Sequence, residues 1–378
     1  MRRVLIVDDS AFNRVTLERA LRDVPGIQVV GTAVDGYDAI RQIRRWQPHV
    51  MTLDLEMPRM DGLSLIRWVM QRHPLPILVV TSRESNYSLF EALELGALDF
   101  VLKPGRVSPD LASIRQDLIT KIHQVVDIPM HARRYRPGDH RTAADTPPAP
   151  AVCLEPLAAG HVPRVIAMVA STGGPAALQV ILRALPGTFP IPIIVVQHMP
   201  SHFTQAFARR LDETASLKVV EARKGEQVLP GMVLIAPGGS HMMLVEGSQR
   251  SLWIALRPGL ETDPYIPSGD RLLASVAAVC GDAGAGVILT GMGQDGCQGL
   301  KRLREAGGLT MAESEESAVV YGMPRHALAA GAVQEIMPLE QIVAQIKLMG
   351  QAAASAALGG PATQATDRFA AQERRENA

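Results

Sequence analysis

The chain has 378 residues, more than one ordinary domain, so we expect two domains that each bury a core. Lys plus Arg and Asp plus Glu are equal at 38 each, which argues against a broadly basic nucleic-acid-binding surface and against an acidic tail. Cys153, Cys280 and Cys297 lie far apart without CxxC spacing or a Cys/His cluster, which argues against a disulfide scaffold and a zinc site.

The N-terminal residues and the length of the apolar runs indicate a cytoplasmic protein. Residues 1–12, "MRRVLIVDDSAF", carry two arginines and a short apolar run without a small-residue cleavage site, unlike a signal peptide. No apolar run reaches the ~18 residues that a membrane span needs. We therefore expect a cytoplasmic location with reduced thiols and no membrane insertion.

Short apolar runs alternate with segments of helical period through residues 1–123. The runs lie at residues 4–7, 29–34, 50–55, 77–82 and 100–103. This alternation is typical of a parallel sheet wrapped by helices. The sequence therefore predicts a first doubly wound α/β domain over residues 1–123.

The rest of the chain predicts a linker, a second domain and a tail. Residues 124–162 are rich in Pro, Ala and Arg, as expected of a linker. Residues 163–348 repeat the α/β alternation, except that 241–256 predict a local hairpin around a Gly-Ser turn. Residues 349–378 carry little large apolar surface, which predicts a disordered tail. The expected fold class is α/β, with two doubly wound parallel-sheet domains.

Ionisable side chains follow the predicted strands of the first domain. Asp8 and Asp9 end the first strand, Asp54 the third, Thr81 the fourth and Lys103 the fifth. The carboxyl ends of parallel strands meet in one crevice, and crowded carboxylates favour a hard divalent cation such as Mg²⁺. A carboxylate beside Mg²⁺ can attack a phosphoryl group while a hydroxyl and an ammonium neutralise the phosphoryl oxygens. Asp54, Thr81 and Lys103 fit these three roles.

Four motifs of this domain, "LIVDDS", "LDLEMPRMDG", "VVTS" and "LDFVLKP", resemble the response-regulator receiver domain over nearly all of residues 1–123. The resemblance implies a flavodoxin-like fold with Asp54 as the phosphoacceptor. It implies that Mg²⁺ is held by Asp8, Asp9, Asp54 and the backbone of Glu56. It also implies that Thr81 and Phe100 form the switch pair beside Lys103.

In the second domain, Ser171 lies where a predicted strand meets a predicted helix. Gly173 and Gly174 allow the backbone to turn, and Pro175 suits the first helical position. The N–H groups at such a helix start can bind a phosphate or the oxyanion of an acyl intermediate. Ser171 by itself therefore leaves open whether this is a nucleophile or a phosphate-binding loop.

Two further strand ends favour the nucleophile. His198 and Asp295 follow later apolar runs, and a histidine oriented by a carboxylate can take the proton of a serine hydroxyl. The segment "STGGPAAL" matches neither GxGxxG nor GxxxxGK[ST], which argues against a nucleotide-phosphate loop. His202 and His241 remain competing candidates for the base.

The segments "ASTGGPAAL", "VVQHMPSHFTQAFARRLD", "LIAPGGSHM", "LTGMGQDG" and "VVYGMPR" resemble the chemotaxis protein-glutamate methylesterase family over most of residues 163–345. The resemblance implies a Rossmann-like esterase domain without a cofactor. By motif, Ser171 is the nucleophile, His198 the base and Asp295 its orienter. Thr172 and the backbone N–H of Met292 then lie near the oxyanion. The segment "YIPSGD" departs from the family pattern, because Gly269 stands where an aliphatic residue is usual.

The two resemblances together imply a phosphorylation-activated serine esterase of chemotactic adaptation. It would hydrolyse glutamyl methyl esters, and deamidate glutamines, on methyl-accepting chemoreceptors. A histidine kinase of the chemotaxis system would be the phosphodonor, and the unphosphorylated receiver would cover the esterase cleft.

Two alternatives stay open: a receiver-controlled paralogue that serves a non-chemotaxis receptor array, and a receiver with a non-catalytic partner- or DNA-binding output. A DNA-binding output would usually add a basic helix-turn-helix, whereas Arg133, Arg134 and Arg136 lie in the linker. We therefore expect no nucleic-acid partner.

Overall fold

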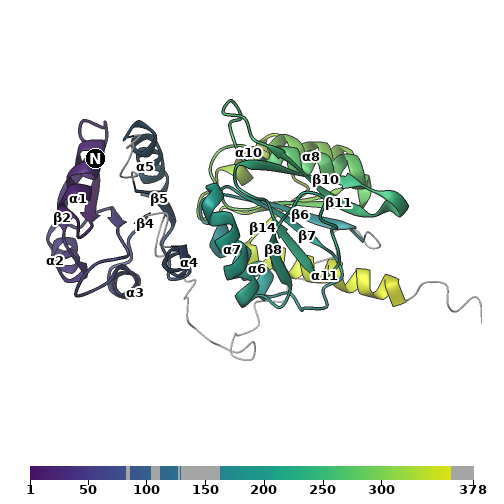
Figure 1. The fold of residues 1–378 in the computed structure, drawn as a ribbon, viewed down its shortest axis with the longest axis horizontal. Helices are drawn as coiled ribbons and strands as arrows, with labels where there is room; N and C mark the ends of the chain where they lie inside the picture. Colours follow the sequence, from purple (N-terminus) through teal and green to yellow (C-terminus); the bar gives the residue numbers. More distant parts are fainter. Residues whose placement is uncertain (82–85, 104–110, 127, 129–161, 359–378) are drawn as a thin grey trace, which may run out of the picture.

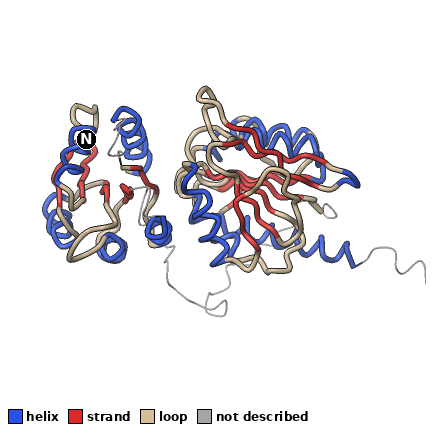
Figure 2. The backbone as a smooth tube through the Cα atoms, viewed as in Figure 1, coloured by secondary structure: helices blue, strands red, loops and turns tan. Residues whose placement is uncertain are grey.

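A computed structural model describes residues 1–81, 86–103, 111–126, 128 and 162–358. These residues form two parallel sheets with helices on both faces, and a separate two-stranded hairpin. Figures 1 and 2 show the two sheets side by side, each enclosed by its own helices. The predicted fold class, two doubly wound α/β domains with a local hairpin, is confirmed.

The N-terminal domain contains a five-stranded sheet in the order β2-β1-β3-β4-β5, with all neighbours parallel. This is the flavodoxin-like order. Its strands are β1 (Arg2–Val7), β2 (Ile27–Ala33), β3 (Val50–Leu53), β4 (Ile77–Thr81) and β5 (Asp99–Leu102). Its helices are α1 (Ala11–Leu21), α2 (Gly36–Trp46), α3 (Gly62–Arg72), α4 (Asn86–Glu94) and α5 (Leu111–Val125). Each of the five predicted apolar runs overlaps one of the strands.

The C-terminal domain contains a seven-stranded parallel sheet in the order β14-β13-β12-β6-β7-β9-β8. Its strands are β6 (Val165–Ala170), β7 (Ile193–Gln197), β8 (Lys218–Glu221), β9 (Met232–Ile235), β12 (Gly284–Ile288), β13 (Leu309–Glu313) and β14 (Glu335–Met337). The apolar runs of this domain, at residues 164–171, 191–198, 232–237 and 285–291, overlap β6, β7, β9 and β12, and none of them overlaps β8, β13 or β14. The strands β8 and β14 are short and partly polar. Both lie at the edges of the sheet, where a strand has a neighbour on one side only and is less buried.

Helices cover both faces of this sheet. They are α6 (Gly174–Arg183), α7 (Ser201–Thr214), α8 (Gly269–Cys280), α9 (Cys297–Glu305), α10 (Met323–Ala329) and α11 (Leu339–Leu358), with short 3₁₀ turns η2 (Ser248–Arg250) and η3 (Gly281–Ala283). Alternate residues of β6 pack on opposite faces: Ile166 and Met168 lie in one apolar cluster with α6, α7 and α11. Ala167 and Val169 lie in the other cluster, with α8, α9 and α10. Burial on both faces explains why β6 reads as an unbroken apolar run.

The predicted hairpin is confirmed: β10 (Ser240–Glu246) pairs antiparallel with β11 (Leu252–Pro258). The predicted disordered tail is wrong for residues 349–358, because α11 continues to Leu358. Buried Ile342, Ile346 and Met349 anchor this helix, and the alanines that follow favour its continuation. Residues 359–378 and most of the predicted linker, 129–161, lie outside the described residues, and so do Cys153 and the three linker arginines.

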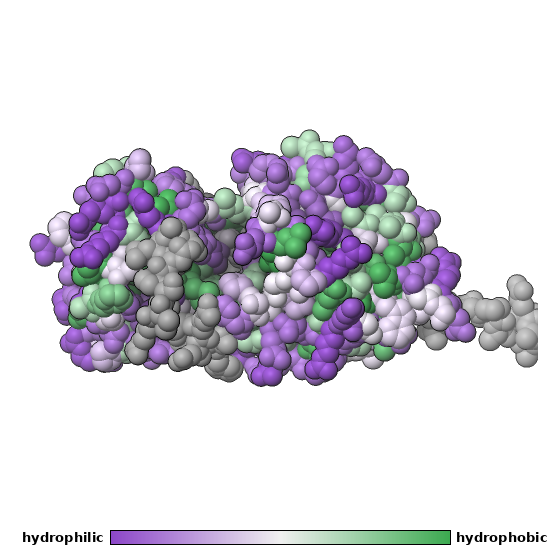
Figure 3. Space-filling view, turned by 45° about the horizontal axis from the view of Figure 1, so that its top comes forward, coloured by the Kyte–Doolittle hydropathy of each residue, from purple (hydrophilic) through white to green (hydrophobic). Residues whose placement is uncertain are grey.

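Most of the surface seen in Figure 3 is hydrophilic, with hydrophobic side chains in small separate groups. Within the ranges given above, no helix combines the length and apolar character needed to cross a membrane.

Candidate active site and acidic cluster

The carboxyl ends of β7, β6 and β12 bring the three predicted triad positions together. Ser171 follows β6, His198 follows β7, and Asp295 lies in the loop after β12. Strands β7, β9 and β8 lie on one side of β6, and the later strands β12, β13 and β14 lie on its other side. The strand order therefore reverses between β6 and β12. Crevices at such reversals are the usual ligand sites of open α/β sheets.

A tight turn carries Ser171 from β6 into α6. The Ser171 N–H donates to the Thr290 carbonyl at 3.0 Å, and the Ser171 carbonyl accepts from Gln197 Nε2 at 2.9 Å. Gly173 has a φ of 79°, in the left-handed region that favours glycine. A β carbon on Gly174 would lie 2.2 Å from Gln197 Oε1. Both glycines are therefore needed for the chain to turn this close to β7.

His198 and Asp295 form a hydrogen-bonded pair. The distance between His198 Nε2 and Asp295 Oδ2 is 2.7 Å, and the Asp295 side chain is only 1% exposed. Asp295 also accepts from the hydroxyl of Ser268 at 3.0 Å and from the N–H groups of Gly269 and Asp270 at 2.5 and 3.0 Å, at the start of α8. Burial alone would raise the pKa of Asp295, but the hydrogen bond and charge of His198, together with the N–H groups of Asp270 and Gly269, lower it below its ordinary value of 3.8.

An ionised Asp295 fixes the orientation of the His198 ring and leaves Nδ1 as the nitrogen that can take a proton. The His198 N–H donates to the Ala170 carbonyl at 3.0 Å, so Ser171 and His198 start from neighbouring strand ends. Among the hydrogen bonds of the described residues, none joins Ser171 Oγ to His198. Catalytic hydrogen bonds are often longer in resting enzymes than in substrate complexes.

The competing histidines lie elsewhere. His241 is 1% exposed on β10, and its Nε2 lies 2.8 Å from Asp263 Oδ2. His202 lies in α7 with its ring against Phe203, at a centroid distance of 4.6 Å. Of the three histidines weighed from the sequence, His198 is the one that the structure pairs with Asp295.

Both predicted oxyanion positions contact the N-terminal domain. Thr172 is 5% exposed, and its hydroxyl donates to Asp99 Oδ2 of β5 at 2.5 Å. Met292 is 41% exposed, and its sulfur contacts Gln124 Nε2 of α5. Sequence reasoning identified neither Asp99 nor Gln124, because no local pattern shows which residues meet across two domains.

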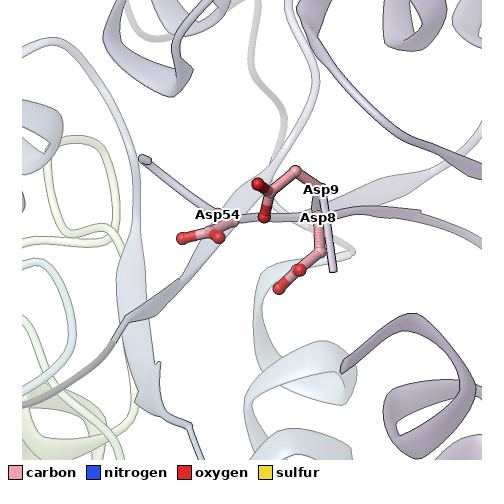
Figure 4. Close-up of side chains that lie close together, drawn as sticks. All are labelled: Asp8, Asp9 and Asp54. Atoms are coloured by element: carbon pink, nitrogen blue, oxygen red, sulfur yellow. The ribbon is translucent and has the colours of Figure 1, made fainter. Parts of the chain in front are cut away.

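The predicted acidic cluster is present in the N-terminal domain. Oxygen atoms of Asp8, Asp9 and Asp54 lie within 4.8 Å of one another, and their three carboxylates are shown in Figure 4. Lys103 Nζ lies 2.5 Å from Asp54 Oδ2 and 3.1 Å from Asp8 Oδ2. Burial raises the pKa of Asp54 above 3.8, and the charge of Asp8 adds to this effect, although Lys103 opposes it.

The other predicted receiver residues lie on β4, on β5 and in the loop after β3. Thr81 ends β4 at 1% exposure, and its carbonyl accepts from the Lys103 N–H at 2.8 Å. The Glu56 N–H donates to Asp54 Oδ1 at 3.4 Å. Phe100 in β5 is buried, and its ring packs edge-on against Phe203 of α7, with centroids 4.9 Å apart. The aromatic member of the predicted switch pair therefore contacts the C-terminal domain.

Sequence reasoning also missed a residue beside His198. The ring of Tyr265 stacks on the imidazole at a centroid distance of 5.1 Å and an interplanar angle of 14°. In the segment "YIPSGD", the family pattern draws attention only to Gly269. A β carbon there would lie 2.4 Å from Val169 Cγ1, so this glycine lets α8 begin close against β6.

Two family models match this chain, one over each domain. A family model described as CheB methylesterase matches residues 166–346, and one described as response regulator receiver domain matches residues 4–114. The solved catalytic domain of the Thermotoga maritima CheB methylesterase is 38% identical and covers 49% of this chain and 98% of that chain, with a TM-score of 0.47.

Two curated relatives match nearly the full length. Protein-glutamate methylesterase/protein-glutamine glutaminase 3 of Geobacter sulfurreducens is 43% identical over 358 residues, covering 91% of this chain and 96% of that protein. Protein-glutamate methylesterase/protein-glutamine glutaminase 6 of Anaeromyxobacter dehalogenans is 44% identical over 347 residues, covering 91% and 94%. The chain therefore belongs to the family of protein-glutamate methylesterases/protein-glutamine glutaminases in which a receiver domain precedes a CheB methylesterase domain.

Proposed function

We propose that this chain is a serine esterase that hydrolyses glutamyl methyl esters and deamidates glutamines on chemoreceptors, and that phosphorylation of Asp54 activates it. The observation that carries the proposal is the pairing of His198 with buried Asp295 at the strand ends next to Ser171. Membership in the methylesterase/glutaminase family supports the same reaction.

In the proposed reaction, Ser171 Oγ attacks the ester carbonyl carbon while His198 Nδ1 takes the hydroxyl proton. The oxyanion accepts a hydrogen bond from the Met292 N–H and lies beside Thr172. The carbonyl re-forms as the C–O bond to the methoxy group breaks, and His198 gives its proton to the departing oxygen, which leaves as methanol. Water then attacks the acyl-serine, His198 takes a proton from the water and returns it to Ser171 Oγ, and glutamate is released. A glutamine substrate loses ammonia in place of methanol.

The acidic cluster fits a divalent cation. Asp8, Asp9 and Asp54 place three carboxylates together, and carboxylate oxygens are ligands that Mg²⁺ prefers. Together with the Glu56 carbonyl, these residues would hold Mg²⁺, which when bound neutralises phosphoryl oxygens as Asp54 is phosphorylated. Lys103 and the Thr81 hydroxyl would pair with the remaining phosphoryl oxygens. A chemotaxis histidine kinase is the proposed donor.

The contacts between the domains support inhibition by the unphosphorylated receiver. Asp99 binds the hydroxyl of Thr172, directly after Ser171, and Gln124 contacts Met292. Phe100 packs on Phe203 from the same strand that leads to Lys103. A phosphoryl group on Asp54 would draw Lys103 from its present carboxylate partners and so alter the end of β5. We propose that this change favours receptor access to Ser171.

The experiment that tests the proposed function is methanol release from methylated receptor membranes, with and without a small phosphodonor and Mg²⁺. We expect slow release without the phosphodonor and faster release with it. Absence of methanol under both conditions would contradict the esterase. Equal release under both conditions would contradict the activation by phosphorylation.

An ion pair between the domains offers a separate test of the inhibition. Glu94 of α4 accepts from Arg210 Nε and Nη2 of α7 at 2.7 and 2.8 Å, and from Gln179 Nε2 of α6 at 2.7 Å. Figure 1 shows α4 on the side of its domain that faces these helices. Burial would raise the pKa of Glu94, but the bonds from Arg210 and Gln179 lower it below 4.5. The carboxylate is therefore ionised and paired at neutral pH.

Replacing Arg210 by alanine should raise unstimulated methanol release roughly tenfold, the factor that corresponds to ~1.4 kcal/mol, because it leaves Glu94 without its charged partner. Arg209→Ala, at an exposed position next to it on α7, is the matched control and should not change the rate. The double variant Glu94→Arg/Arg210→Glu should restore slow release. An unchanged unstimulated rate in Arg210→Ala would show that the contact does not hold the domains together.

A further inference from the structure

Tyr265 lies on the face of the His198 imidazole and comes from a segment remote from the triad in sequence. Its ring is nearly parallel to the imidazole, with centroids 5.1 Å apart, within the range of offset-stacked aromatic pairs. Tyr265 is only partly buried, so the ring lines the site instead of filling the core. The hydrogen bond to Asp295 fixes one edge of the imidazole, and the stacked ring limits its rotation about that bond.

The residues before Tyr265 are fixed by a second histidine–aspartate pair. Asp263 accepts from His241 Nε2 at 2.8 Å, from the Leu260 N–H at 2.8 Å and from Arg271 Nη2 at 2.8 Å. His241 is 1% exposed on β10, so this anchor lies in the buried part of the hairpin. These hydrogen bonds lower the pKa of Asp263 to about 2, which keeps it charged at neutral pH.

The residues after Tyr265 are tied to the catalytic carboxylate itself. Ser268 Oγ donates to Asp295 Oδ1 at 3.0 Å, and the Gly269 N–H donates to Asp295 Oδ2 at 2.5 Å. At the tip of the side chain, a β carbon on Gly293 would lie 2.3 Å from Tyr265 Oη, so the phenol packs directly on the backbone next to Met292. Tyr265 is thus fixed on both sides along the chain and at its hydroxyl end.

We propose that Tyr265 is a positioning residue of the methylesterase reaction, and that its aromatic face holds the His198 imidazole in line between Asp295 and Ser171. This inference rests on the proposed function. The same face stabilises the imidazolium that forms when His198 takes the serine proton, since a cation within about 6 Å of an aromatic centroid is attracted to the ring. Both effects need a flat aromatic ring and neither needs the hydroxyl.

The test compares Tyr265→Phe, which keeps the ring, with Tyr265→Leu, which keeps an apolar side chain but has no aromatic face. Both variants are made in the full chain and activated by a small phosphodonor with Mg²⁺. Methanol release from methylated receptor membranes is measured as kcat and KM. We expect Tyr265→Phe to behave like the wild type and Tyr265→Leu to lose kcat by about tenfold with KM unchanged. Glu261→Ala, at an exposed position of the same segment, is the control and should leave both constants unchanged.

A second readout removes the receptor from the measurement. The rate at which an activated phosphonate labels Ser171 should fall in Tyr265→Leu and not in Tyr265→Phe. Equal rates in wild type and Tyr265→Leu would overturn the proposal, and so would an equal loss in both variants, since the hydroxyl would then be responsible. If Tyr265→Leu does not fold, Tyr265→Met, which also lacks a ring, is measured instead. Failure of the wild type to release methanol would count against the proposed function, not against the role of Tyr265.

Discussion

Ser171→Ala should lower methanol release from methylated receptors by about a millionfold, the scale seen when a triad serine is removed from a serine hydrolase. Without Oγ no acyl-serine forms, and only the oxyanion donors and substrate binding remain to speed the attack of water. The measurement is methanol release by the full chain with a phosphodonor and Mg²⁺ present. Ser248→Ala, at an exposed position in the turn between β10 and β11, is the matched control and should keep full activity.

The same assay tests whether Ser171 acts as a unit with His198. Residues of one catalytic unit give strongly non-additive losses, so Ser171→Ala/His198→Ala should be no slower than Ser171→Ala alone. A Ser171→Ala enzyme that still releases methanol near the wild-type rate would exclude Ser171 as the nucleophile. Additive losses in the double variant would instead show that His198 and Ser171 act independently.

Asp54→Asn should abolish the stimulation of methanol release by a small phosphodonor, so that the ratio of stimulated to unstimulated rates becomes one. The amide has nearly the shape of the carboxylate but cannot attack phosphorus, and it removes one of the three carboxylates of the acidic cluster. Chelation of Mg²⁺ in the wild type should abolish the stimulation in the same way. The measurement is the pair of rates with and without phosphodonor.

The matched control is Asp23→Asn, at an exposed residue of the same domain with a φ of 58°. Asparagine tolerates this left-handed conformation, so the control should retain full stimulation. Persistent stimulation in Asp54→Asn would mean that another residue accepts the phosphoryl group or that the phosphodonor acts elsewhere.

The sequence by itself determined the two α/β domains. It also showed which residues follow their strands. Strands such as β1 and β6 are buried on both faces, so they stand out as apolar runs, and the residue that follows each run is placed at the carboxyl edge of the sheet by geometry alone. Ser171, Asp295 and Asp54 could be proposed as site residues in this way. The same reasoning could not choose among His198, His202 and His241, because all three lie at or near strand ends.

Only the tertiary structure decided which side chains meet. His198 pairs with Asp295 across 97 residues of chain, and Thr172 meets Asp99 across 73 residues. Such contacts depend on how two sheets and their loops pack, and local periodicity carries no information about them. Tyr265 was missed for this reason: it lies outside any strand or helix, in a segment whose position is set by Asp263 and by Asp295. The sequence names the reactive groups, and the packing of remote segments determines which of them touch.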